Sequence, residues 1–185
     1  MLKTLDKGFT GLVTVSGPTN SGKSELAEFL IKDHKIINYI ATSKVRKGDK
    51  DWQKRINIHR KRRPRDWKII EYPFDICKCI KSIHDYESIL IDSSGGIVEK
   101  HLEMNSSEWS SFQSKFCNFL IKKKSAIIVV LEEIGWGIVP ATPIGHLYRE
   151  RLSQFSRLIS NNSTNKWLVV QGTAIDLDQV GYRIP

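Results

Sequence analysis

The sequence has no apolar run long enough to cross a bilayer. Its longest run covers only Ala126 to Leu131, whereas a membrane-spanning helix needs about 20 apolar residues. The first nine residues, Met1 to Phe9, contain neither the apolar stretch nor the cleavage pattern of a signal peptide. We therefore expect no membrane span and no secretory signal, and we expect residues 1–10 to be a short extension before the first strand.

Cysteine is also scarce. Cys77, Cys79 and Cys117 form an odd set without C-x-x-C spacing, which disfavours both a disulfide framework and a zinc site. Small buried apolar roles suit them better, and the reducing cytoplasm is the expected location.

What remains is the composition of an ordinary globular protein. The 185 residues are 40% hydrophobic and 26% charged, which predicts one domain, residues 1–185, with a substantial core. The net charge of +9 favours anionic partners, and eight Lys or Arg residues lie between Lys54 and Lys68. Composition alone does not distinguish nucleic acid from a nucleotide or another phosphorylated substrate.

One stretch points to a nucleotide. Gly17 to Ser24 fits the phosphate-binding loop pattern G-x-x-x-x-G-K-[ST]. The apolar, β-branched run Leu12 to Val15 precedes it and predicts a buried strand, and Glu25 to Ile31 follows it with the apolar spacing of a helix. Strand, glycine loop and helix are the arrangement that phosphate binding requires, so we predict a nucleotide-binding protein.

Each part of this loop has an expected role. The glycines let backbone N–H groups curl round a phosphate, and the helix N-terminus adds a partial positive charge. Lys23 would reach the β- and γ-phosphates as a catalytic group, and Ser24 would ligate Mg²⁺. The predicted nucleotide-binding residues of the loop are Gly17, Pro18, Thr19, Asn20, Ser21, Gly22, Lys23 and Ser24.

Strands and helices alternate along the rest of the chain, which predicts an α/β, P-loop NTPase-like domain with a mainly parallel sheet covered by helices on both faces. Further strands are expected at Ile36–Thr42, Trp67–Tyr72, Ser88–Asp92, Ala126–Leu131 and Lys166–Gln171, and helices at Trp52–Arg62, Phe74–Ile83, Ser106–Lys124 and about Gly145–Ser160. Ligands of such sheets bind outside the carboxyl ends of the strands. The sequence places the phosphate loop, Thr42-Ser43, Asp92 and the loop Glu132 to Pro140 at that edge.

Two residues have competing interpretations. Asp92 ends an apolar strand, where a P-loop fold places an acid on the Mg²⁺ side, although it could be an ordinary strand-end polar residue. His59 would share a helical face with Arg55, Arg62 and Arg63. Such cations disfavour the protonated imidazole, leaving a lone pair that could attack a phosphate. The alternative is a solvated basic helix with an incidental histidine.

Longer motifs match a known family. The chain resembles the bifunctional adenosylcobinamide kinase / adenosylcobinamide-phosphate guanylyltransferases of cobalamin biosynthesis. Four blocks spanning most of the chain carry the match: Gly17 to Ser24; Tyr39-Ile40-Ala41-Thr42; Arg55-Ile56-x-x-His59-Arg60-x-x-Arg63-Pro64-x-x-Trp67-x-x-x-Glu71; and Glu133-x-Gly135-x-Gly137-Ile138-Val139-Pro140, with Arg149 downstream.

The resemblance implies one nucleotide site that serves two reactions. A nucleoside triphosphate, GTP or ATP, phosphorylates the aminopropanol hydroxyl of the corrinoid substrate. A histidine, here His59, then attacks the α-phosphate of GTP, and its guanylyl group passes to adenosylcobinamide phosphate. The resemblance further implies a homotrimer. It assigns the nucleotide contacts to Thr42, Ser43, Arg55, Arg60, Arg63, Glu71 and Asp92.

Departures from the family pattern keep a second interpretation open. Many relatives have two adjacent histidines where this chain has Ile58 and His59. A divergent relative that binds GTP or ATP but has lost guanylyl transfer is therefore the alternative. A third class, a nucleic-acid binder acting through Lys54 to Lys68, is disfavoured because Trp67 is the only stacking aromatic in that segment.

Overall fold

The computed structural model describes residues 9–44, 48–49, 53–54, 56–57, 60, 62–137 and 139–184. Its strands form one seven-stranded sheet in the order β3-β2-β4-β5-β1-β6-β7, and every pairing is parallel except that of β6 with β7. The strands are β1 (Gly11–Gly17), β2 (Ile37–Ala41), β3 (Lys68–Glu71), β4 (Ser88–Asp92), β5 (Ala126–Glu132), β6 (Asn165–Val170) and β7 (Thr173–Asp176). The predicted α/β class is confirmed.

Alternation along the strands produces two cores. Side chains of a strand point alternately to opposite faces of the sheet. In β5, Ile127 and Val129 therefore belong to one apolar cluster and Ile128 and Val130 to the other. All four are completely buried, which is why this strand is a continuous apolar run in the sequence.

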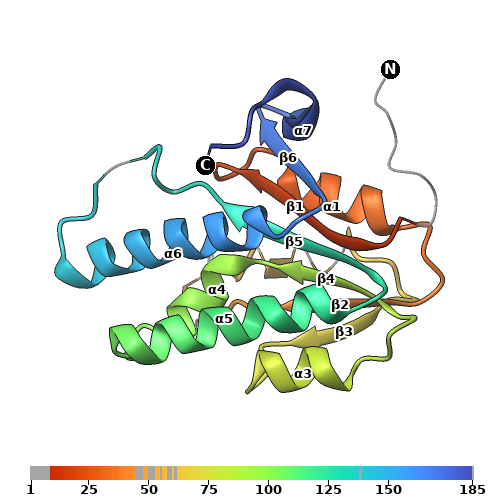
Figure 1. The fold of residues 1–185 in the computed structure, drawn as a ribbon, viewed down its shortest axis with the longest axis horizontal. Helices are drawn as coiled ribbons and strands as arrows, with labels where there is room; N and C mark the ends of the chain where they lie inside the picture. Colours follow the sequence, from red (N-terminus) through yellow and green to blue (C-terminus); the bar gives the residue numbers. More distant parts are fainter. Residues whose placement is uncertain are drawn as a thin grey trace.

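Helices cover both faces, as expected (Figure 1). The helix α1 (Lys23–Ile31) contributes Ala27 and Ile31 to the cluster on one face. The larger cluster on the other face is packed by α3 (Ile76–Ser82), α4 (Ser94–Lys100), α5 (Ser106–Lys122) and α6 (Pro143–Asn161).

Local capping chemistry explains where the longer helices begin. Asn105 and Glu108 form a reciprocal capping box at the start of α5. Thr142 accepts a hydrogen bond from the Gly145 N–H at the start of α6, whose first residue is Pro143. Proline suits that position, because its missing N–H is not needed in the first turn.

The sequence prediction missed three elements. The helix α4 directly follows Asp92 and contains two glycines, each of which costs roughly 1 kcal/mol relative to alanine in a helix. Close packing explains them, since a Cβ on Gly96 would lie 2.5 Å from Thr42 Oγ1. The strand β7 and the helix α7 (Leu177–Val180) were also not predicted. The two-residue turn before β7 needs left-handed conformations at Gln171 and Gly172, and glutamine is a weak signal for such a turn.

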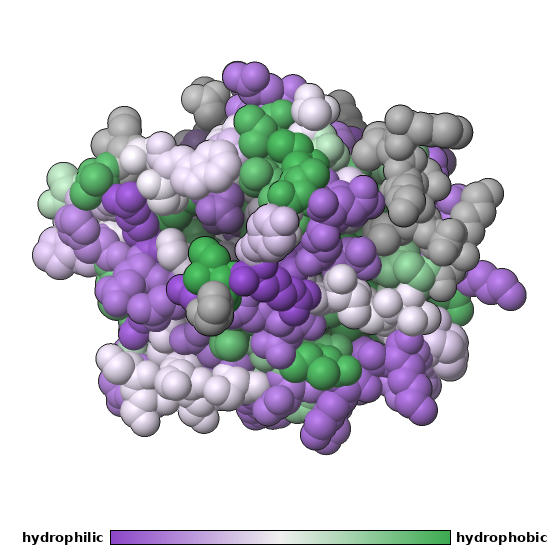
Figure 2. Space-filling view, turned by 45° about the horizontal axis from the view of Figure 1, so that its top comes forward, coloured by the Kyte–Doolittle hydropathy of each residue, from purple (hydrophilic) through white to green (hydrophobic). Residues whose placement is uncertain are grey.

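The expected helix Trp52–Arg62 falls partly outside the described residues. Those that are described, at 53, 54, 56, 57, 60 and 62, are helical. No helix among the described residues is long and apolar enough to span a membrane. On the face shown in Figure 2, hydrophobic side chains form small separate patches among hydrophilic ones.

Candidate active site

The predicted phosphate loop connects the end of β1 to the start of α1. Asn20 and Gly22 adopt left-handed backbone conformations, with φ of 57° and 97°. Gly17 leaves no room for a side chain, because a Cβ there would lie 2.4 Å from the Val169 carbonyl oxygen. The shape of the loop therefore explains why glycine occupies positions 17 and 22.

Lys23 and Ser24 lie at the first turn of α1 and line a cavity. The Lys23 ammonium group donates a hydrogen bond to the Pro18 carbonyl oxygen at 3.0 Å, and the residue is only 6% exposed. Its side chain is thus folded over its own loop, where a phosphate would be cradled. The Ser24 hydroxyl donates to Asp92 Oδ1 at 3.4 Å.

Asp92 is held from two sides. Its Oδ2 accepts a hydrogen bond from the hydroxyl of Tyr39, which is fully buried on the neighbouring strand β2. Burial, together with the Asp92 carboxylate, raises the pKa of Tyr39 above its usual range, so the phenol remains a donor. Two oxygen groups, the Ser24 hydroxyl and the Asp92 carboxylate, thus meet at the edge of the loop. Hard cations such as Mg²⁺ prefer oxygen ligands, so the pair fits the expected metal.

The arginines of the basic segment have different surroundings. Arg63 stacks its guanidinium on the Tyr39 ring, 4.0 Å from the centroid, and its side chain is 9% exposed. Its Nε is buried and lacks a hydrogen-bond partner among the described residues. A buried guanidinium with an unused donor, lining a cavity, is suited to an anion.

Arg60 and Arg62 make ion pairs across the site. Arg60 forms two hydrogen bonds, of 2.8 and 2.7 Å, with the Glu71 carboxylate, and these lower the pKa of Glu71. Arg62 instead pairs with Glu25 and Glu28 of α1. The segment around these arginines is therefore connected both to α1 and to the end of β3.

A cavity of about 640 Å³ joins these groups. Eight of the predicted residues line it: Thr19, Lys23, Ser24, Ser43, Arg60, Arg63, Glu71 and Asp92. Gly17, Pro18, Asn20, Ser21 and Gly22 form the loop itself and are absent from the lining. Thr42 is buried and exchanges hydrogen bonds with the Ser93 backbone instead. The predicted His59 and Arg55 lie outside the described residues.

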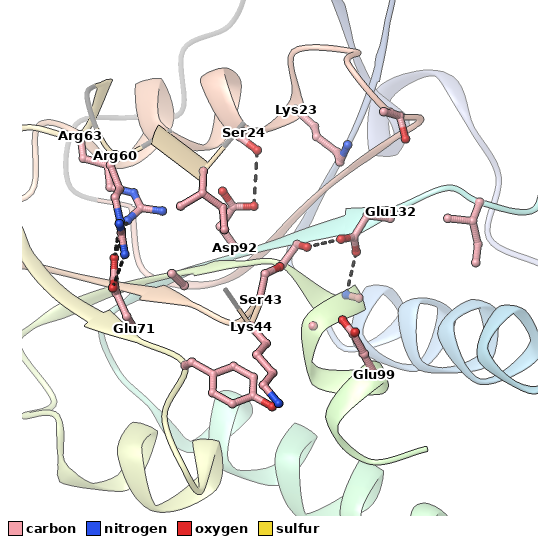
Figure 3. Close-up of a pocket in the computed structure, with 18 of the residues that line it drawn as sticks. Lys23, Ser24, Ser43, Lys44, Arg60, Arg63, Glu71, Asp92, Glu99 and Glu132 are labelled. Carbon is pink, nitrogen blue, oxygen red and sulfur yellow. Dashed lines mark hydrogen bonds and ion pairs between the residues drawn. The ribbon is translucent and has the colours of Figure 1, made fainter. Parts of the chain in front are cut away.

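Sequence reasoning missed the opposite wall of the cavity. Lys44 and Glu99 lie there (Figure 3), and the lining also contains Tyr72, Tyr148 and Glu132, the last at the start of the predicted loop Glu132 to Pro140. The predicted position of the loop starting at Glu132 was the one available signal. Glu99 could not be foreseen, because α4 was not predicted.

Glu132 lines the cavity and also stabilises the backbone beside it. Its carboxylate accepts hydrogen bonds from the Ser93 hydroxyl, the Ser94 hydroxyl and the Gly95 N–H, the last two at 2.8 Å. It therefore fixes the turn that leads from Asp92 into α4.

Comparisons with known proteins identify a family that matches most of the chain. A family model described as cobinamide kinase / cobinamide phosphate guanyltransferase matches residues 13–177. The chain is 27% identical over 181 residues to the bifunctional adenosylcobalamin biosynthesis protein CobU of Escherichia coli K12, covering 90% of this chain and 99% of that protein. Its identity to the protein of the same name from Salmonella typhimurium LT2 is 25%, with the same coverage.

A solved structure supports the fold alone. The P4 protein from bacteriophage phi6, in complex with ADP, superposes with a TM-score of 0.51 at 12% sequence identity. The match covers 94% of this chain and 56% of the phage protein. The likeness is one of fold, and it agrees with the α/β class that the sequence predicted.

Proposed function

The chain belongs to the cobinamide kinase / cobinamide phosphate guanyltransferase family, and from this premise we propose that the cavity described above serves both reactions. In the first, a nucleoside triphosphate phosphorylates the hydroxyl of adenosylcobinamide. In the second, GMP passes from GTP to adenosylcobinamide phosphate, giving adenosylcobinamide-GDP. The observation that carries the proposal is the convergence of the phosphate loop, Asp92 and Arg63 on one cavity.

The phosphate loop and its lysine bind the triphosphate in both reactions. The backbone from Gly17 to Gly22 surrounds the phosphates, and the Lys23 ammonium exchanges its bond to Pro18 for a phosphate oxygen. Ser24 and Asp92 are the residues that would hold Mg²⁺. Bound there, the ion would neutralise phosphate charge.

His59 is the proposed nucleophile of the second reaction. A neutral imidazole attacks the α-phosphorus of GTP, pyrophosphate leaves, and the phosphate of the corrinoid then displaces the histidine. Arg63 supports this assignment, since its unused buried Nε and its position in the cavity suit a phosphate oxygen. Arg55 and Arg60 are proposed as further phosphate neighbours, with Arg60 leaving Glu71 when nucleotide binds.

A second candidate function rests on Ile58. Because many members of the family it resembles have a histidine at that position, the alternative is a chain that binds GTP or ATP and performs only the kinase step. Both candidates predict the same phosphate loop chemistry, and they differ only in the covalent step.

The reaction products test the proposal directly. Adenosylcobinamide incubated with the protein, Mg²⁺ and GTP should gain first a phosphate and then a GMP group, both identified by mass. Adenosylcobinamide phosphate as the only product would support the kinase-only alternative. Unchanged adenosylcobinamide, with either ATP or GTP, would contradict both candidates.

We propose a cytoplasmic homo-oligomer, with a trimer as the expected form. The free thiols of Cys77, Cys79 and Cys117 support a reducing compartment.

A further inference from the structure

A bidentate ion pair connects the helix of the phosphate loop to the basic segment. Arg62 donates from Nε to Glu28 Oε2 at 2.7 Å and from Nη2 to Glu28 Oε1 at 2.9 Å. Two parallel bonds of this kind fix the relative orientation of the two groups as well as the distance between them. The Nη1 of the same arginine pairs with Glu25, one helical turn earlier on α1. One side chain therefore joins the basic segment to two positions of α1.

The Glu28–Arg62 pair is partly shielded from solvent. The side chain of Glu28 is 11% exposed and that of Arg62 is 26% exposed, whereas that of Glu25 is 59% exposed. The pair that Arg60 makes with Glu71 of β3 is also more exposed, at 43% and 45%. Exposed ion pairs contribute little to stability and are weakened by salt. The contact with Glu28 is therefore the firmer of these connections.

Both sides of the Glu28–Arg62 pair lead directly to the cavity. The helix α1 begins with Lys23 and Ser24, which line it. Arg63, the residue after Arg62, lines it as well and stacks its guanidinium on the Tyr39 ring. Glu28 and Arg62 themselves are absent from the lining. The pair therefore lies behind the cavity and determines how two parts of its wall are placed relative to each other.

We propose that Glu28 and Arg62 are positioning residues for guanylyl transfer. Their contact holds the basic segment against the phosphate-loop helix, so that the nucleophile and Arg63 meet the α-phosphate of the GTP that the loop binds. This inference rests on the proposed function, which assigns the nucleophile to His59, three positions before Arg62 in the sequence.

The kinase step depends less on this contact. Its proposed phosphate and metal groups, Lys23, Ser24 and Asp92, belong to α1 and β4 and not to the basic segment. Its attacking oxygen comes from a second substrate and not from the protein. A displacement of the basic segment should therefore slow guanylyl transfer selectively.

The variants Glu28→Gln and Arg62→Gln test this selectivity, since each removes the charge of one partner. We expect each to lower the rate at which GTP alone guanylylates the protein by at least about tenfold, because a misplacement of about 1 Å can cost 10²-fold. The kcat for phosphorylation of adenosylcobinamide should remain within threefold of the wild type. The double variant should be no slower in guanylylation than Arg62→Gln, because the two residues act through one contact.

Two further variants complete the experiment. Arg62→Lys keeps the positive charge but not the bidentate geometry, and it too should lower guanylylation more than phosphorylation. Asp178→Asn is the matched control, because Asp178 pairs with Lys166 at 2.6 Å and does not line the cavity. It should match the wild type in both reactions.

Other results count against the positioning role. Guanylylation within tenfold of the wild type in both Glu28→Gln and Arg62→Gln would overturn it. An equal loss in the two reactions would also do so, since it would indicate a general structural defect. Multiplicative losses in the double variant would show that the residues act independently. A wild type that takes up no GMP would instead overturn the proposed function on which this inference rests.

Discussion

Replacing Lys23 with alanine is expected to lower the kinase and the guanylylation reactions together, each by about 10³-fold. Lys23 is the buried cation of the phosphate loop, and its side chain already lies against the loop carbonyl of Pro18. A positioned cation that stabilises charge on a transferring phosphoryl group contributes on this scale. Product formation from adenosylcobinamide and from adenosylcobinamide phosphate measures the two effects separately.

Lys32→Ala is the matched control for this prediction. Lys32 is an exposed lysine at the other end of the same helix, where its ammonium lies 4.1 Å from the centre of the Phe29 ring. Its replacement should leave both reactions within about twofold of the wild type, since it is remote from the cavity lining. A Lys23→Ala enzyme with more than a tenth of the wild-type rate in either reaction would show that the loop does not hold the reacting phosphates.

Arg151→Met is expected to lower the free energy of unfolding by about 3 kcal/mol or more. Arg151 is 5% exposed, and its guanidinium donates to the carbonyl oxygens of His101, Leu102 and Met104 at 2.9, 3.1 and 2.5 Å. These acceptors follow α4, so the arginine connects α6 to the segment after that helix. Methionine keeps much of the apolar packing but leaves the three carbonyls without this donor, and each such loss costs about 1–3 kcal/mol.

Thermal unfolding measures this effect. For a chain of this size, a loss of 3 kcal/mol corresponds to a fall in Tm of roughly 6–12 °C. Arg157→Met is the control, because Arg157 is exposed on the same helix, and such surface changes usually stay within about 0.5 kcal/mol. Equal Tm values for the two variants would contradict the structural role of Arg151.

The parts of the site that were predictable are those with a local sequence signal. The phosphate loop depends on consecutive residues. Before it, Leu12–Val15 is the apolar, β-branched run of a buried strand, and after it Glu25–Ile31 has the apolar spacing of a helix. Asp92 was predictable because an apolar run ends on an acid. The two faces of the sheet were likewise predictable, since alternation along each strand determines which residues enter which core.

Contacts between separate elements were not predictable in this way. Tyr39 reaches Asp92 only because β2 and β4 are neighbours in the sheet. The helical tendency of α4 is hidden by its glycines, whose tight packing on Thr42 depends on tertiary structure. Glu99 and Tyr148 could be brought to one cavity only after both of their helices had been placed.

Labelling with GTP tests the central claim, that this P-loop site forms a covalent guanylyl-histidine. Wild-type protein incubated with α-labelled GTP and Mg²⁺ should acquire an acid-labile label, and mass spectrometry should locate the added GMP on the peptide that contains His59. The His59→Ala variant should lose the label and still phosphorylate adenosylcobinamide. A wild type that takes up no label, or a His59→Ala variant that keeps it, would contradict the mechanism.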